Sequence, residues 1–200
     1  PIEHASFTFA IEGVSRSFLA QMTRHRIASY SVQSQRYVSE QNFEYVIPPE
    51  IEAIPQAKAE FLASMEESRR RYENLAEILQ KKHETELLKQ GKEPKAAARA
   101  AQKQAIEDAR FVLPNACGTK MICTMNARSL SNFFSLRCNR AQWEIRGVAT
   151  RMLRLVRGVA PHLFARCGPP CLRGACPEGK MSCGRAEQVR AYFEHLEETK

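Results

Sequence analysis

The sequence lacks both a long apolar run and an apolar leader. No stretch reaches the roughly 18 apolar residues that a membrane-spanning helix needs, and no charged-then-apolar segment opens the chain as a secretory signal does. We therefore expect a cytoplasmic protein with no membrane partner. The chain opens on Pro1, and strand-like sequence follows at once, so we expect a fragment whose N-terminal part is missing.

Acidic residues are fewer than basic residues, and aromatic residues are few. The 22 Asp and Glu against 30 Lys and Arg leave a net charge of +8, which favours anionic partners. Only 8% of residues are aromatic, so a basic helix has few stacking partners for bases. We therefore expect no nucleic-acid partner, and a solvated or subunit-facing surface for Arg146, Arg151, Arg154 and Arg157.

The chain has an odd number of cysteines, seven, and four of them lie within residues 167–183. Without an export signal, a disulfide framework is not expected. Four thiolates can hold zinc, but zinc motifs usually show two separate short Cys pairs. We therefore favour no metal, keep a zinc site as the lesser alternative, and expect Cys117 and Cys123 to be buried. The zinc alternative would use Cys167, Cys171, Cys176 and Cys183.

Length and periodicity predict a mixed α/β fold. The 200 residues, 44% of them hydrophobic, can bury one sizeable core. We expect a main domain over 1–166 and a Cys-rich loop with a C-terminal helix over 167–200. Alternation predicts strands at 4–11, ended by Gly13, at 43–47 and at 120–125. Helical spacing predicts helices at 14–26, 56–88, 95–110, 141–159 and 185–198, and one that begins at Asn126 or Ser129 and reaches Arg137. Residues 27–42 are expected to be irregular.

The densest chemical signal is Arg24-His25-Arg26, followed after seven residues by Ser34 and then Arg36. Guanidinium groups match phosphate oxygens bidentately, and hydroxyls supply further hydrogen bonds. The pattern therefore indicates a phosphate-bearing ligand, with a solvated basic turn as the alternative for the triplet taken alone.

The whole string from Arg24 to Tyr37 resembles the signature of flavin-dependent thymidylate synthases. Pro1-Ile2-Glu3-His4 looks like the Pro-x-Glu-His segment of that family. The segments Asn126-Ala127-Arg128-Ser129-Leu130, Asn132-Phe133 and Ala141-Gln142-Trp143-Glu144-Ile145 look like its second half. The resemblance covers about residues 1 to 160 and makes 1–166 the expected catalytic domain.

The resemblance implies two sets of site residues. The set that would contact FAD is Glu3, Arg24, His25, Arg26, Asn126, Arg128 and Asn132. The set that would bind dUMP is Gln21, Arg24, Ser34, Arg36, Arg110 and Arg137, with Arg137 as the main catalytic side chain.

The resemblance also implies a small twisted sheet with long helices, assembled as a homotetramer with active sites between subunits. The implied reaction methylates dUMP to dTMP, taking the one-carbon unit from 5,10-methylenetetrahydrofolate and hydride from FAD reduced by NADPH. A fixed cation beside the uracil ring would stabilise the charge that develops as C5 becomes nucleophilic, and arginine stays protonated in that role.

Departures from the family pattern leave two alternatives open. Ser31-Val32 stands where many members carry Asn-Glu, so a carboxylate often found at the site is absent. The run from Leu136 to Arg140 is shorter than usual, and Arg140 stands where a histidine often does. The first alternative is an inactive flavin- or nucleotide-binding homologue. The second is a basic nucleic-acid-binding protein with a zinc-stabilised tail.

Overall fold

A computed structural model describes residues 1–36 and 43–196, and in it the chain forms two compact units. The first unit comprises Pro1–Glu12, Phe18–Ser31 and Met121–Lys200, and the second comprises Gly13–Ser17 and Val32–Lys120. Helices and a small sheet both occur, which confirms the mixed fold class. The predicted division at 166/167 stays a prediction.

The sheet has three strands in the order β1-β3-β2. They are β1 (Ser6–Ser15), β2 (Ser29–Val32) and β3 (Gly118–Asn126), so the strands predicted at 4–11 and 120–125 are confirmed. β1 and β3 are antiparallel, since Ala127 N donates to Ala5 O at one end and Arg16 N to Cys117 O at the other.

Two expectations about strands are wrong. Gly13 does not end β1, because the strand passes through it with a φ of 68°, a backbone conformation that glycine adopts without the strain of a side chain. The strand expected at 43–47 is reduced to one antiparallel bridge between Tyr45 and Cys117. β2 lies within the segment that was expected to be irregular.

The helix expected at 14–26 is shorter in the structure. It is α1 (Arg16–Met22), because residues 13–15 complete β1 and a turn follows Met22. The predicted stripe is nevertheless correct, since Val14, Phe18 and Met22 are all buried.

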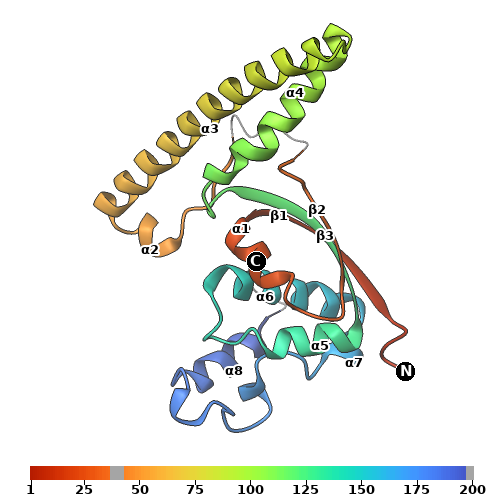
Figure 1. The fold of residues 1–200 in the computed structure, drawn as a ribbon. Helices are drawn as coiled ribbons and strands as arrows, with labels where there is room; N and C mark the ends of the chain where they lie inside the picture. The colour runs from red at the N-terminus through yellow and green to blue at the C-terminus, as the bar shows by residue number, and fades with distance from the viewer. Residues whose placement is uncertain (37–42, 197–200) are drawn as a thin grey trace. The chain divides into compact units, whose positions relative to one another are not determined.

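The second unit contains a helical hairpin (Figure 1). After the single turn α2 (Pro49–Glu52), α3 (Pro55–Lys89) runs close to its predicted bounds, and α4 (Pro94–Ala109) returns beside it, followed by the short 3-10 turn η1 (Arg110–Val112). Tyr72 of α3 is fully buried against Ile106 and Ala109 of α4. Small residues make this contact possible, since α4 buries an alanine every fourth residue: Ala97, Ala101, Ala105 and Ala109.

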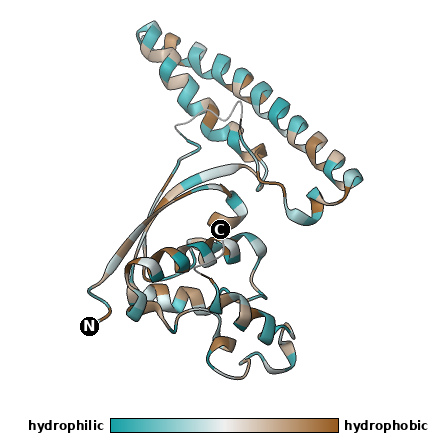
Figure 2. Ribbon diagram, turned by 180° about the vertical axis from the view of Figure 1, so that it is seen from behind, coloured by the Kyte–Doolittle hydropathy of each residue, from teal (hydrophilic) through white to brown (hydrophobic). Residues whose placement is uncertain are grey.

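The solvent-facing side of the hairpin is largely hydrophilic (Figure 2). Glu67 pairs with Arg70 and Arg71, and Glu77 pairs with Lys81. Each pair spans three or four residues, about one turn of α3. Such exposed pairs add little to stability, so burial around Tyr72 does more to hold the hairpin together.

The helices of the first unit pack around aromatic side chains. They are α5 (Ala127–Ser135), α6 (Trp143–Val159), α7 (Pro161–Phe164) and α8 (Ala186–Glu194), and Asn126 caps α5 as one of the two predicted candidates. Phe164 lies edge-on to Phe7 of β1 at 5.2 Å and to Phe134 of α5 at 6.2 Å, centroid to centroid. The end predicted for the last helix at residue 198 lies outside the described residues.

The arginines of α6 are not a free basic stripe. Arg146 donates to Asn139 O at 2.9 Å, Arg154 to Leu196 O at 2.8 Å, and Arg157 to both Phe193 O and Cys167 O. These three residues tie the loop before α6 and the tail to the helix, and the solvated or subunit-facing surface stays a prediction.

Candidate functional site

The triplet Arg24-His25-Arg26 occupies the turn that follows α1. The turn is set locally, because Thr23 N bonds to Leu19 O and His25 N to Met22 O. Arg24 and Arg26 are exposed, whereas His25 between them is 5% exposed. The turn therefore presents two guanidinium groups to solvent while its histidine points into the unit.

His25 is held between α1 and α5. Its Nε2 lies 3.1 Å from Ser129 O, and its ring meets Phe133 edge-on at 5.2 Å. A carbonyl only accepts, so Nε2 carries the proton and Nδ1 keeps its lone pair. Burial lowers the pKa of His25, the bond to Ser129 opposes this, and the charge of Arg137 lowers it further. The ring is therefore neutral near pH 7.

Tyr30 of β2 closes the same turn, a role that the sequence analysis missed. Its hydroxyl donates to Met22 O at 2.8 Å and to His25 O at 3.1 Å. Burial raises the pKa of Tyr30 to about 12, with Cys123 adding to the rise and Arg137 opposing it. A tyrosine inside the signature string was the available signal, but its partners depend on how the chain folds back.

Arg137 follows α5 and is half-buried. Its guanidinium carbon lies 5.1 Å from the centre of the Phe133 ring, and its Nε is buried with no hydrogen-bond partner among the described residues. Burial lowers its pKa, which Tyr30 opposes. Arg69 and Arg157 also have a buried Nε without a partner, but their terminal nitrogens bond elsewhere.

An unpaired buried donor costs about 1–3 kcal/mol, and a charged one more. The guanidinium of Arg137 therefore lies over an aromatic ring while one of its donors, Nε, has no acceptor among the described residues.

The other residues predicted to contact flavin in this unit gather at the start of α5. Arg128 pairs with Glu3 at 3.3 Å in an exposed ion pair. Asn126 uses its side-chain oxygen to cap Ser129 N at 2.9 Å, and Asn132 is exposed one turn beyond Arg128. The structure thus brings Glu3 and Arg128 together and gives Asn126 a capping role of its own, while the flavin contacts of these residues stay a prediction.

The second unit holds the remaining residues predicted to bind dUMP. Ser34 Oγ accepts from Arg36 N at 3.2 Å, and Arg36 Nε pairs with Glu107 at 2.7 Å. Arg110 Nε donates to Glu107 O at 2.9 Å, and its guanidinium lies 5.6 Å from the Phe111 ring centre. Glu107, which the sequence analysis missed, therefore organises both arginines. Its position three residues before Arg110 on a helix was the only local signal.

Gln21, Arg24 and Arg137 belong to the first unit, while Ser34, Arg36 and Arg110 belong to the second. Within the second group, Glu107 bonds to both arginines. That they form one dUMP site stays a prediction.

All seven cysteines are free thiols. Cys117 and Cys123 are fully buried as predicted, and burial raises the pKa of Cys123 to about 12. Across residues 1–36 and 43–196, no three Cys, His, Asp or Glu side chains stand ready-made as a metal site. The same part of the chain contains no helix with the length and apolar character needed to cross a membrane.

Comparison with known proteins identifies the family of the chain. The family model described as thymidylate synthase complementing protein matches residues 1–162. A flavin-dependent thymidylate synthase of Clostridium tetani is 53% identical over 194 residues, which covers 96% of this chain and 75% of that protein. Proteins of the same name from Geobacter sulfurreducens and Pyrococcus furiosus are 46% and 41% identical, over 98% and 100% of this chain and 75% and 76% of theirs. The chain therefore belongs to the thymidylate synthase complementing protein family.

Proposed function

We propose that this chain is the catalytic part of a flavin-dependent thymidylate synthase. The reaction methylates dUMP to dTMP, with 5,10-methylenetetrahydrofolate as the one-carbon donor and FAD reduced by NADPH as the hydride source. The observation that carries the proposal is the 53% identity to an enzyme of that name over 96% of the chain. The geometry of Arg137 supports it.

Arg137 is the proposed catalytic side chain. The uracil ring must gain electron density at C5, which leaves negative charge on its carbonyl oxygens. A preorganised cation in a site of low dielectric stabilises such charge without reorganising. Arg137 is half-buried, so its guanidinium is partly shielded from water while part of the side chain stays accessible. Its stacking on Phe133 restricts the guanidinium to one place.

The residues present fit a flavin nucleotide. Arg24 and Arg26 are exposed and have no ion-pair partner among the described residues, so their donors are available to a diphosphate. The neutral His25 offers Nδ1 as an acceptor beside them. Asn132 is exposed on the same unit, and Glu3 holds Arg128. When bound, the flavin would supply the hydride chemistry.

The nucleotide phosphate requires fixed donors, which the second cluster provides. Arg36 is restrained by Glu107, and Arg110 by the carbonyl of the same residue. With Ser34, these groups would bind the phosphate of dUMP. The resemblance to the family also assigns Gln21 and Arg24 to dUMP. We further propose that the protein acts in the cytoplasm as a homotetramer whose active sites combine residues of several subunits.

One observation favours a second candidate, an inactive flavin- and nucleotide-binding homologue. Val32 is half-buried at the end of β2, where the family often places a carboxylate. A valine can neither accept a proton nor bind a polar ligand atom. The nucleic-acid alternative has no comparable support, because three of the four α6 arginines bond to backbone carbonyls.

Two measurements test the proposal. Purified protein should retain flavin, seen as a yellow colour and flavin absorbance. It should also release tritium from dUMP labelled at C5 when given methylenetetrahydrofolate and NADPH. Flavin retention without release would favour the inactive homologue, and loss of both would refute the assignment.

A further inference from the structure

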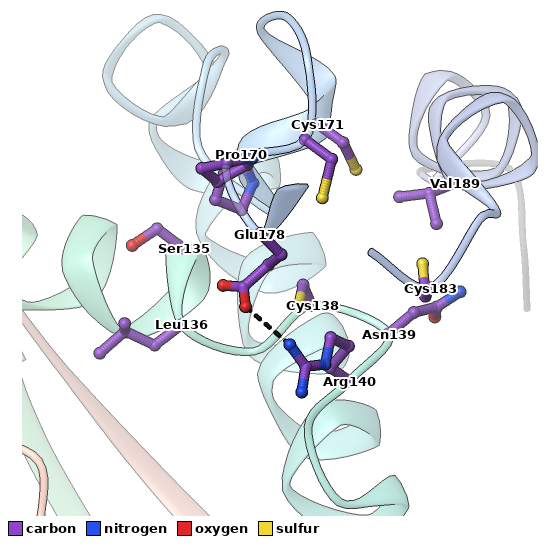
Figure 3. Close-up of a pocket in the computed structure, with 12 residues that line it drawn as sticks. Ser135, Leu136, Cys138, Asn139, Arg140, Pro170, Cys171, Glu178, Cys183 and Val189 are labelled. Atoms are coloured by element: carbon purple, nitrogen blue, oxygen red, sulfur yellow. Dashed lines mark hydrogen bonds and ion pairs between the residues drawn. The ribbon is translucent and has the colours of Figure 1, made fainter. Parts of the chain in front are cut away.

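A cavity of about 250 Å³ lies in the first unit, next to the Cys-rich segment (Figure 3). Residues after α5 form one side, and the segment between α7 and α8 forms the other. Four cysteines line this cavity: Cys138, Cys171, Cys176 and Cys183. This thiol cavity takes no part in the proposed enzyme function, so nothing that follows depends on that function.

The set of thiols differs from the one that sequence spacing suggested. Cys138 joins from the loop after α5, although it lies far from the other three in sequence. Cys167 does not line the cavity. Its Sγ lies 3.1 Å from Ser131 Oγ, and the residue is 6% exposed. Folding therefore replaces one member of the linear motif with a residue from another element.

The backbone around the thiol cavity has little regular structure to hold it. Between α7 and α8 there are only two short 3-10 turns in the described chain, η2 (Pro170–Leu172) and η3 (Gly179–Met181). Polar contacts shape the segment instead. Arg190 donates to Cys171 O and Gly174 O, each at 2.8 Å, and Arg140 pairs with Glu178 at 2.8 Å across the cavity wall.

A segment with little regular secondary structure can be held by a metal, because metal binding contributes to folding. All four thiols are free and so are available as ligands.

We propose that Cys138, Cys171, Cys176 and Cys183 bind one thiophilic divalent cation, with Zn²⁺ as the first candidate. Four thiolates suit the tetrahedral geometry of a closed structural zinc site. No three of these thiols stand at ligand spacing in the described structure, so binding would have to bring them closer together. The thiols lose their protons to solvent as the metal–sulfur bonds form. The cation would cross-link the loop after α5 to the segment before α8.

The first test is direct metal analysis of the full chain, purified and then equilibrated with Zn²⁺ alone. About one zinc per chain should remain after gel filtration, since one closed tetrahedral site takes one ion. Replacing Zn²⁺ with Co²⁺ should produce thiolate-to-cobalt charge-transfer absorption. A chain that retains no zinc would overturn the proposal.

A pair of matched variants tests the ligand set. Cys138→Ser should lower zinc affinity at least about tenfold, as losing one of four ligands does. Cys167→Ser should bind zinc as the unmodified chain does, because its thiol is bonded to Ser131 outside the cavity. Equal losses in both variants, or a loss only in Cys167→Ser, would refute the assignment of Cys138.

A third measurement uses the unmodified chain and so does not depend on the folding of a variant. Alkylation of the native protein, read by peptide mass spectrometry, should label Cys138, Cys176 and Cys183 without zinc and should spare all three when zinc is added. Labelling of the buried Cys123 should not respond to zinc. Unchanged labelling of the cavity thiols would contradict the proposal.

Discussion

Replacing Tyr30 by phenylalanine removes one oxygen atom from the turn that carries Arg24 and Arg26. The Tyr30 hydroxyl donates to Met22 O at 2.8 Å and to His25 O at 3.1 Å. Met22 O keeps a second donor, the amide of His25, whereas His25 O loses the one donor it has among the described residues. Phenylalanine fills the same space, so the change isolates the hydrogen bonds.

The expected loss of stability follows from these partners. A hydrogen bond contributes a net 0.5–1.5 kcal/mol or so, and a buried group left unpaired costs about 1–3 kcal/mol. We therefore expect Tyr30→Phe to lower the free energy of unfolding by about 1–2 kcal/mol. For a chain of this size that equals a decrease in Tm of about 2–8 °C. Urea denaturation monitored by circular dichroism should show the lower midpoint with an unchanged slope.

Tyr192→Phe is the matched control. Tyr192 is 44% exposed, and its hydroxyl makes no hydrogen bond to a described residue, so removing it should change stability by less than about 0.5 kcal/mol. If the two variants are equally stable, the hydroxyl of Tyr30 does not hold the turn. Flavin affinity should fall in Tyr30→Phe alone, because the turn positions the two arginines.

Three further predictions concern charged groups. Arg137→Ala should lower kcat for tritium release by about 10²–10³, the typical effect of removing one preorganised donor, while flavin stays bound; unchanged turnover would end its catalytic role. Glu107→Gln should raise KM for dUMP by up to about fivefold with kcat unchanged, since its half-exposed ion pair with Arg36 is worth at most about 1 kcal/mol; an unaltered KM would show that the pair does not position Arg36. His25 has a folded pKa below its ordinary 6.5, so the unfolded chain gains this proton first as pH falls. The contribution of the neutral His25 to stability is therefore complete above about pH 6.5 and is lost below it. His25→Gln should remove that part of the pH dependence of the urea midpoint. Identical pH profiles for the variant and the unmodified chain would refute the assignment.

The long helices were predictable because their signal is local. The apolar spacing of α3 and the proline and glycine between α3 and α4 located the hairpin to within one or two residues. β2 was missed because Ser29–Val32 carries no strong apolar alternation. It forms at the sheet edge through pairing with β3, and pairing partners distant in sequence leave little trace in a short window.

The arginines of the predicted site show the same limit. Motifs that resemble those of the family predicted them as site residues, but not the groups that restrain them. The carboxylate of Glu107 beside Arg36 is a tertiary neighbour, whereas the Phe133 ring beside Arg137 lies only four residues earlier, at the end of α5. The carbonyl partners of the α6 arginines were likewise hidden, since an arginine facing solvent and one bonded to a distant carbonyl have the same helical spacing.

The sequence by itself determined the family and the main helices, because each depends on residue type and short spacing. Only the tertiary structure decided that Asn126 rather than Ser129 caps α5, that Tyr30 closes the Arg-His-Arg turn, that His25 bonds through Nε2, and that Cys138 rather than Cys167 lines the thiol cavity. These facts depend on which side chains meet after the chain folds back on itself. Burial and the direction of a side chain are properties of that arrangement, and no local pattern encodes them.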